Sequence, residues 1–170
     1  AGAAGSAIVK MLISLGATNI IICDTKGILH KDMDTRGNFL KDELCKLTNP
    51  NQLKGTLRDA IKDADAFIGV SAADMVDAQM VESMAKDAII FAMANPTPEI
   101  MPDIALLAGA KVVGTRRSDF ANQINNVLAF PGIFRGALDV RASDINEAMK
   151  IAATYAIANI IPEEKLSPLY

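Results

Sequence analysis

Residues 1–24 have the sequence AGAAGSAIVKMLISLGATNIIICD, and this stretch decides the fold. It begins with two glycines three positions apart, continues with apolar residues at helical spacing over 4–15, and ends in an apolar β-branched run over 19–23. Asp24 closes that run, 19 residues after Gly5. A glycine turn, a helix and a strand that ends in an acid are together typical of a dinucleotide-binding unit.

The glycine turn predicts where a dinucleotide would lie. Gly2 would let the backbone approach a pyrophosphate, Gly5 would let the helix pack close to a strand, and the helix start at Ala3 and Ala4 would offer N–H donors. We expect Asp24 at the adenosine ribose hydroxyls, with a turn or helix N-cap role as the alternative.

The first glycine of a GxGxxG pattern, and the strand that leads into it, would precede residue 1. We therefore interpret the chain as part of a longer protein whose first strand is truncated. The alternative is a natural domain whose first residues were trimmed.

The rest of the chain alternates predicted strands with predicted helices. The strands are expected over 66–70, 88–94 and 111–114, and the helices over 39–47, 56–64, 77–85, 104–108, 119–128 and 144–160. A capping box of Asp144 and Glu147 would start the last helix. The pattern predicts an α/β fold, a Rossmann-type doubly wound parallel sheet with helices on both faces. It would span residues 1–162, with 163–170 as a C-terminal tail.

Composition narrows the class of protein. The 170 residues are 51% hydrophobic and 22% charged, with a net charge of −3, which suits one globular domain and favours neither nucleic acid nor an anionic membrane as a partner. No apolar run approaches the roughly 18 residues of a membrane span. Cys23 and Cys45 form no CxxC pair, so we expect reduced thiols in a cytoplasmic protein.

Polar residues follow two of the predicted strands. Ser71 comes after the strand at 66–70, and Asn95 closes the strand at 88–94 and precedes a proline. Ligands of open α/β sheets bind outside the carboxyl ends of the strands, so both are candidate cofactor residues and Asn95 is also a candidate substrate residue. The alternative for Ser71 is a loop serine that starts a helix, and the alternative for Asn95 is an asparagine that forms a turn.

A third polar group is the segment NQINN at 122–126. It stands directly before an apolar run, which suggests that Asn125 and Asn126 line a ligand pocket rather than a solvated helix face. His30, the only histidine, is expected to be a solvated loop residue. We interpret Arg116 and Arg117 as a pair of surface charges. The alternative is that they bind the 2′-phosphate of a cofactor.

Four stretches of the chain resemble the malic enzymes, particularly the short bacterial type. They are AGAAG at 1–5, ICDTKG at 22–27, FAMANPTPEI at 91–100 and RSDFANQINNVLAFPGIFRGALDVRA at 117–142. The resemblance implies oxidation of malate with NAD or NADP and decarboxylation to pyruvate and CO₂, assisted by Mg²⁺ or Mn²⁺. It also implies a homodimer or higher homo-oligomer.

By position, the resemblance makes the turn at 2–5 the pyrophosphate site and Asp24 the ribose acid. It places Asn95 at the nicotinamide ribose and the substrate, and Asn125 and Asn126 at the malate carboxylate and nicotinamide side; Ser71 matches less securely. The family's catalytic Tyr and Lys and its Glu and Asp metal ligands precede the glycine turn, so this chain is expected to hold no catalytic or metal-binding residue and to be inactive alone.

Two positions depart from the family pattern, because Arg116 stands where glycine is more frequent and Ala121 where proline often stands. An acid at the ribose disfavours a 2′-phosphate, so we expect NAD rather than NADP. Two other functions stay open. One is the cofactor domain of another hydroxy-acid or amino-acid dehydrogenase, and the other is a stand-alone module that senses NAD(H).

Overall fold

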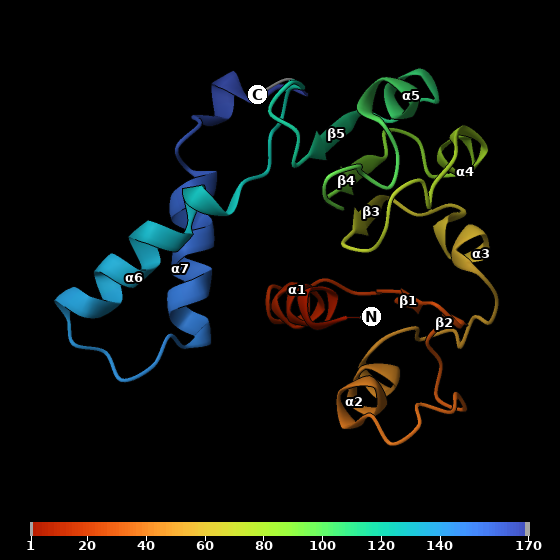
Figure 1. Cartoon of the computed structure of the whole chain (residues 1–170), viewed down its shortest axis with the longest axis horizontal. Helices are drawn as coiled ribbons and strands as arrows, with labels where there is room; N and C mark the ends of the chain where they lie inside the picture. Colours follow the sequence, from red (N-terminus) through yellow and green to blue (C-terminus); the bar gives the residue numbers. More distant parts are fainter. Residues whose placement is uncertain (1, 169–170) are drawn as a thin grey trace.

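The computed structural model describes residues 2–168 and shows a mixed α/β domain (Figure 1). It carries a helical arm, which is formed by residues 130–160. The helices are α1 (Ala3–Ser14), α2 (Phe39–Leu47), α3 (Leu57–Ile61), α4 (Ala78–Glu82), α5 (Pro102–Leu107), α6 (Phe130–Asp139) and α7 (Glu147–Ala158). The strands are β1 (Cys23–Asp24), β2 (Gly27–Ile28), β3 (Ala66–Gly69), β4 (Ile89–Ala92) and β5 (Val112–Thr115). Two 3₁₀ turns, η1 (Asn126–Leu128) and η2 (Glu163–Lys165), complete the described elements.

The centre of the fold is a parallel sheet in the order β3-β4-β5. Its register pairs Ala66 with Ile89 and Ile89 with Val112, so the three strands end level with one another. Each crossover contains a helix, as parallel strands require. The expected class, a parallel sheet flanked by helices, is confirmed.

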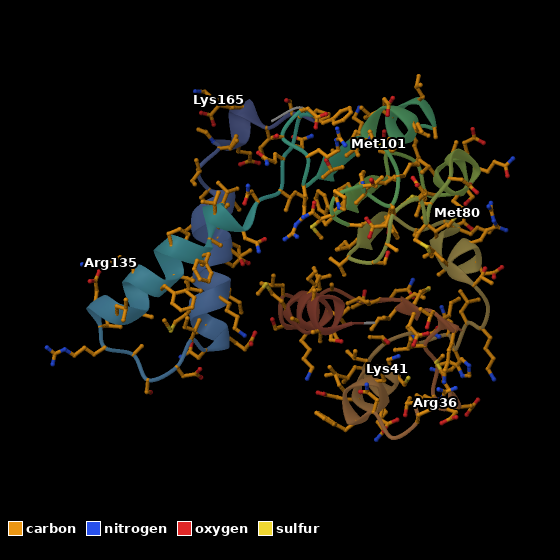
Figure 2. The ribbon with its side chains drawn as sticks, in the orientation of Figure 1. Arg36, Lys41, Met80, Met101, Arg135 and Lys165 are labelled. Carbon is orange, nitrogen blue, oxygen red and sulfur yellow. The ribbon has the colours of Figure 1, made fainter. Side chains whose placement is uncertain are left out.

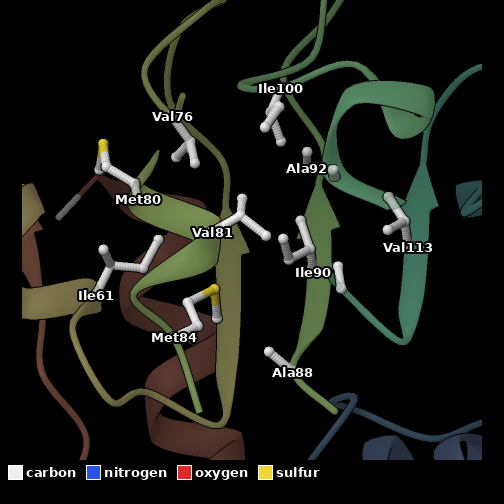
Figure 3. Packing of buried hydrophobic residues seen from close by; sticks show 12 residues of the cluster. Ile61, Val76, Met80, Val81, Met84, Ala88, Ile90, Ala92, Ile100 and Val113 are labelled. Atoms are coloured by element: carbon white, nitrogen blue, oxygen red, sulfur yellow. The ribbon is translucent and has the colours of Figure 1, made fainter. Parts of the chain in front are cut away.

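The main hydrophobic core lies between this sheet and α3, α4 and α5. Ile90 and Ala92 point to the same face of β4, are fully buried, and meet the apolar sides of the helices (Figure 3). Met80 and Val81 of α4 and Ile61 of α3 complete the contact. The strands therefore have their own core, made by the residues between 57 and 113.

A second, smaller core joins α1 to α2. Val9 of α1 and Leu44 and Cys45 of α2 pack with Ile22 and Leu29. The expectation of a parallel strand over 19–23 is wrong for most of that run, since only Cys23 and Asp24 form a strand, and it pairs antiparallel with β2.

The reason lies in the partners of the backbone. The carbonyl of residue 20 accepts from Asn49 N at 2.7 Å, and that of Ile22 accepts from Leu29 N at 2.8 Å. The apolar run is thus buried as an extended segment, but loops rather than a neighbouring strand satisfy its hydrogen bonds.

The chain after β5 differs from its prediction. The expected helix over 119–128 is absent, and only η1 forms there, with Asn125 accepting from Val127 N at 3.1 Å as its N-cap. Asparagine favours such caps over helix interiors. Helix α6 instead begins at Phe130, because a proline in the first helical turn loses no hydrogen bond there.

The last predicted helix is confirmed as α7, with a different start. Asn146 is its N-cap and accepts from Met149 N at 3.0 Å, so the capping box of Asp144 and Glu147 was wrong. In Figure 1, α6 and α7 lie beside each other and apart from the sheet, and neither contains a buried residue.

Candidate functional site

The start of α1 is open. Gly2 is the N-cap in extended conformation, no side chain caps the helix, and a Cβ built at Gly2 would meet nothing within 4 Å. The first N–H groups of a helix have no partner within it and carry the positive end of its dipole, which suits an anion. Ser6 closes the turn from inside by donating its hydroxyl to the Gly2 carbonyl at 2.8 Å.

Gly5 brings this helix start to the sheet. A Cβ at Gly5 would lie 3.5 Å from Cγ2 of Val70, the residue that follows β3. That is an ordinary contact, so the close packing expected of Gly5 exists but would also admit alanine. The first turn of α1 therefore lies against the carboxyl end of β3, which is where open parallel sheets bind ligands.

Asp24 lies at the end of β1 with its side chain only 7% exposed. One carboxylate oxygen accepts from Lys26 N at 2.7 Å, and the other pairs with Nζ of Lys41 at 2.5 Å. Lys41, labelled in Figure 2, extends from α2. Burial by itself raises the pKa of Asp24, but the hydrogen bonds from Lys41 and Lys26 outweigh it and hold that pKa below its ordinary value. The carboxylate is thus ionised and has a cation beside it.

A buried glutamate lies beneath the ends of β3 and β4. Glu99 is 0% exposed; its Oε1 accepts from Ser71 N at 2.7 Å and Ser71 Oγ at 3.0 Å, and its Oε2 accepts from Ala94 N at 2.9 Å. Both donors of Ser71 are therefore engaged inside the protein. Direct donation from Ser71 to a ribose or phosphate, as expected from the sequence, does not fit this arrangement.

Sequence reasoning missed Glu99. It follows the turn Pro-Thr-Pro and carries no signal of burial, because acids in loops are normally exposed. The sequence signal that could have found it is Gly69, because a glycine inside a strand leaves room for another group to approach closely. The close neighbour is Glu99 itself, since a Cβ at Gly69 would come within 2.6 Å of its Oε1.

Asn95 extends from the same loop. It follows Ala94, precedes Pro96 through a cis peptide bond, and is exposed. Its amide makes no hydrogen bond to the residues between 2 and 168, which leaves it free to donate and accept toward a ligand.

Asn125 and Asn126 lie close to the end of β5. Ile124 N donates to the carbonyl of Thr115, the last residue of β5, at 2.7 Å, and both asparagines follow directly and are exposed. The Asn126 side chain accepts from Arg116 Nη2 at 2.8 Å. Arg116, where the family pattern departs, thus contacts one of the predicted site residues.

The structure therefore brings most of the predicted residues to one edge. The start of α1, the loop with Ser71, Asn95 and the segment with Asn125 and Asn126 all follow or face the carboxyl ends of β3, β4 and β5. Asp24 lies apart from these ends, on the β1–β2 hairpin, which the second core joins to α1.

His30 is a further correction. It lies in a loop, as predicted, but it is half-buried, and its Nδ1 is buried without a hydrogen-bond partner among the described residues. Cys45 is buried, and the two described cysteines form no disulfide bond with each other; burial raises the pKa of Cys23 to about 11.

Two further features are absent from residues 2–168. No group of three or more His, Cys, Asp or Glu side chains there could hold a metal ion. No helix in that range is both long enough and apolar enough to cross a bilayer.

Comparison with known proteins shows which family this chain is similar to. A family profile described as "Malic enzyme, NAD binding domain" matches residues 109–170. The chain is 59% identical over its whole length to the bifunctional malic/malolactic enzyme of Bacillus subtilis, covering 42% of that protein. It is 53% identical over 99% of its length to the NAD-dependent malic enzyme of Geobacillus stearothermophilus, covering 35% of it.

Solved structures give the same result. The NAD-dependent malic enzyme of Thermotoga maritima superposes with a TM-score of 0.87 at 42% identity, over 97% of this chain and 43% of that one. The malic enzyme of Entamoeba histolytica does so with a TM-score of 0.93 at 37% identity, over 99% and 36%. The chain thus spans less than half the length of these relatives, and it belongs to the malic enzyme family, as part of the family's NAD-binding region.

Proposed function

We propose that this chain binds NAD(H) for a malate-oxidising, decarboxylating enzyme. The observation that carries the proposal is the uncapped start of α1, which lies against the carboxyl end of β3. Its first N–H groups fit a pyrophosphate, and no side chain of residues 2–168 caps them. The exposed amide of Asn95 and the asparagines at 125 and 126 follow the neighbouring strands and fit the nicotinamide and substrate side.

Bound NAD supplies the hydride acceptor; the chain's own residues hold it and orient the substrate. In this proposal Ala3, Ala4 and Gly5 donate backbone N–H groups to the phosphates, and Asp24 accepts from the ribose hydroxyls. Asn95, Asn125 and Asn126 offer amides for the carboxamide and for the malate hydroxyl and carboxylate.

The pair of Asp24 and Lys41 bears on the choice of cofactor. A carboxylate at the ribose repels a 2′-phosphate, which favours NAD, whereas Lys41 Nζ within 2.5 Å offsets that repulsion. We propose NAD as the preferred cofactor and NADP as a tolerated one. The relatives include both NAD-dependent and NADP-dependent malic enzymes. The NADP-dependent malic enzyme of Rhizobium meliloti, for example, is 49% identical over 96% of this chain, which covers 21% of that protein.

Conversion of malate to pyruvate and CO₂ is proposed for the whole protein. Hydride transfer needs a base within hydrogen-bond reach of the substrate hydroxyl, and decarboxylation is assisted by a metal. The described residues do not offer a site for Mg²⁺ or Mn²⁺. By family resemblance, we therefore place the metal ligands, and the Tyr and Lys that would supply the base, in the part of the whole enzyme that this chain does not include. Cytoplasmic location and homo-oligomeric assembly are further proposals.

Calorimetric titration of NADH into the folded chain tests the cofactor role. We expect saturable binding, and Asp24→Ala should weaken NAD more than NADP because the lost carboxylate accepts from the ribose and opposes only the 2′-phosphate. Asp42→Ala, which removes an exposed carboxylate of α2 that does not contact Asp24, is the control and should leave both affinities unchanged. No heat at millimolar NADH from a folded sample would contradict the proposal.

A further inference from the structure

The buried carboxylate of Glu99 joins two loops that carry predicted site residues. It receives Ser71 N and Ser71 Oγ on one oxygen and Ala94 N on the other. The backbone adds two more links, from Val76 N to the Glu99 carbonyl at 3.0 Å and from Asp74 N to the Pro98 carbonyl at 3.2 Å. The loops after β3 and β4 are thus held together mainly through Glu99, with one further link at its neighbour Pro98.

The space left by the missing side chain of Gly69 also fixes the position of this carboxylate. Gly69, at the end of β3, has no side chain, and the Glu99 carboxyl group occupies that space. The carboxylate is fully buried, and no Lys or Arg side chain pairs with it among the described residues. Three N–H and O–H donors stabilise it instead, and a buried acid held in this way requires both loops to be in place.

We propose that Glu99 is a positioning residue, which sets the position of Asn95 by fixing Ala94 N relative to the Ser71 loop. Ala94 is the immediate neighbour of Asn95, whose own side chain has no internal partner to hold it. The proposal rests on the proposed function, because it assigns Glu99 an effect on cofactor and substrate that it does not touch.

The first test compares Glu99→Gln with Asn49→Asp in the full-length protein. Asn49 is a matched control: it is 1% exposed and makes three hydrogen bonds to backbone groups, but at residues 29 and 53, beside the other core. Glutamine keeps the shape of glutamate but turns an NH₂ group toward one of the N–H donors. We expect at least a tenfold loss in kcat/KM for malate with Glu99→Gln, and less than twofold with Asn49→Asp.

Two further variants separate positioning from stability. Gly69→Ala leaves Glu99 unchanged but displaces its carboxyl group, so it should reproduce the kinetic loss. In an Asn95→Ala background Glu99→Gln should cost less than twofold more, because the residue it positions has gone. Hydrogen exchange at the Ser71 and Ala94 amides should speed up in Glu99→Gln and stay unchanged in Asn49→Asp.

The outcomes distinguish the two proposals. A wild-type protein that binds no dinucleotide and oxidises no malate would overturn the proposed function and this inference together. An active wild type in which Glu99→Gln and Asn49→Asp lose activity equally, or in which Glu99→Gln and Asn95→Ala add fully, would overturn the positioning role alone. If Glu99→Gln does not fold, Gly69→Ala and Ser71→Ala decide, and normal kinetics in both would overturn it.

Discussion

The sheet and the helical arm use apolar residues in opposite ways. Ile90 of β4 is 0% exposed, within a core made wholly by residues between 57 and 113. Leu138 of α6 is 72% exposed, and Phe130 and Ile160 are similarly open. An apolar stripe at helical spacing thus predicts a face that is to be buried. Only the structure shows whether another part of this chain covers that face.

The largest expected effect tests the sheet. Ile90→Ala should destabilise the protein by about 2–5 kcal/mol, because it removes buried methyl groups and leaves a cavity between β4 and α4. Urea unfolding measures it. A loss below about 1 kcal/mol would mean that the sheet is no better packed than the arm, and the contrast between the two regions would fail.

A smaller effect is expected at the junction of α2 and β1, which is intermediate in burial. Asp24→Asn should cost on the order of 1–2 kcal/mol near pH 7, because it removes a charged acceptor from Lys41. The folded pKa of Asp24 lies below its ordinary value of 3.8, so its stabilisation is present above that pH and is lost as the pH falls through the folded value. The melting temperatures of the wild type and of Asp24→Asn should therefore draw together as the pH falls below 3.8 and through the folded pKa. A gap that does not shrink at all as the pH falls below 3.8 would contradict the ion pair.

Asn126→Ala should change function more than stability. The side chain is exposed and, among residues 2–168, bonds only Arg116. The free energy of unfolding should therefore change by under about 0.5 kcal/mol, while turnover or malate affinity of the full-length protein falls strongly. Gln123→Ala, at an exposed neighbouring position, is the control. A large drop in melting temperature with normal kinetics would show that Asn126 belongs to the packed region.

The smallest effect is expected in the arm. Leu138→Ser should change the stability of the isolated chain by less than about 0.5 kcal/mol, because the side chain is already in water. The readout is the same urea titration used for Ile90→Ala. A loss of more than about 1 kcal/mol in the free energy of unfolding would mean that the Leu138 side chain is buried in solution.

The sequence predicted best where local pattern and tertiary structure agree. The three strands of the sheet, α1 and α7 lie close to their expected positions, because their apolar spacing matches the faces they present. The run at 19–23 failed, because its hydrogen-bond partners, Asn49 and Leu29, are distant in sequence. Helix α6 was not predicted, because Pro131 interrupts the apolar pattern in the sequence, whereas in the structure it lies in the first turn of the helix and loses no hydrogen bond there.

The candidate site shows the same division. Gly2, Asp24 and Asn95 were predicted as candidates from their spacing relative to strands and turns, which is local information. Glu99 was not, because its importance comes from Gly69, thirty positions away, whose missing side chain provides its space. Ser71 was identified at the right place, but the structure gives its donors to a different partner.

The fit of Glu99 into the space above Gly69 has a consequence for how the family can diverge. A side chain at position 69 and a glutamate at position 99 compete for one volume, so neither position can drift alone. Lineages that gain alanine or serine at 69 should also have lost the acid at 99, and should fix the loop after β4 by some other bond. The two sites should therefore change as a pair during evolution, while the exposed positions of the loops around them vary independently.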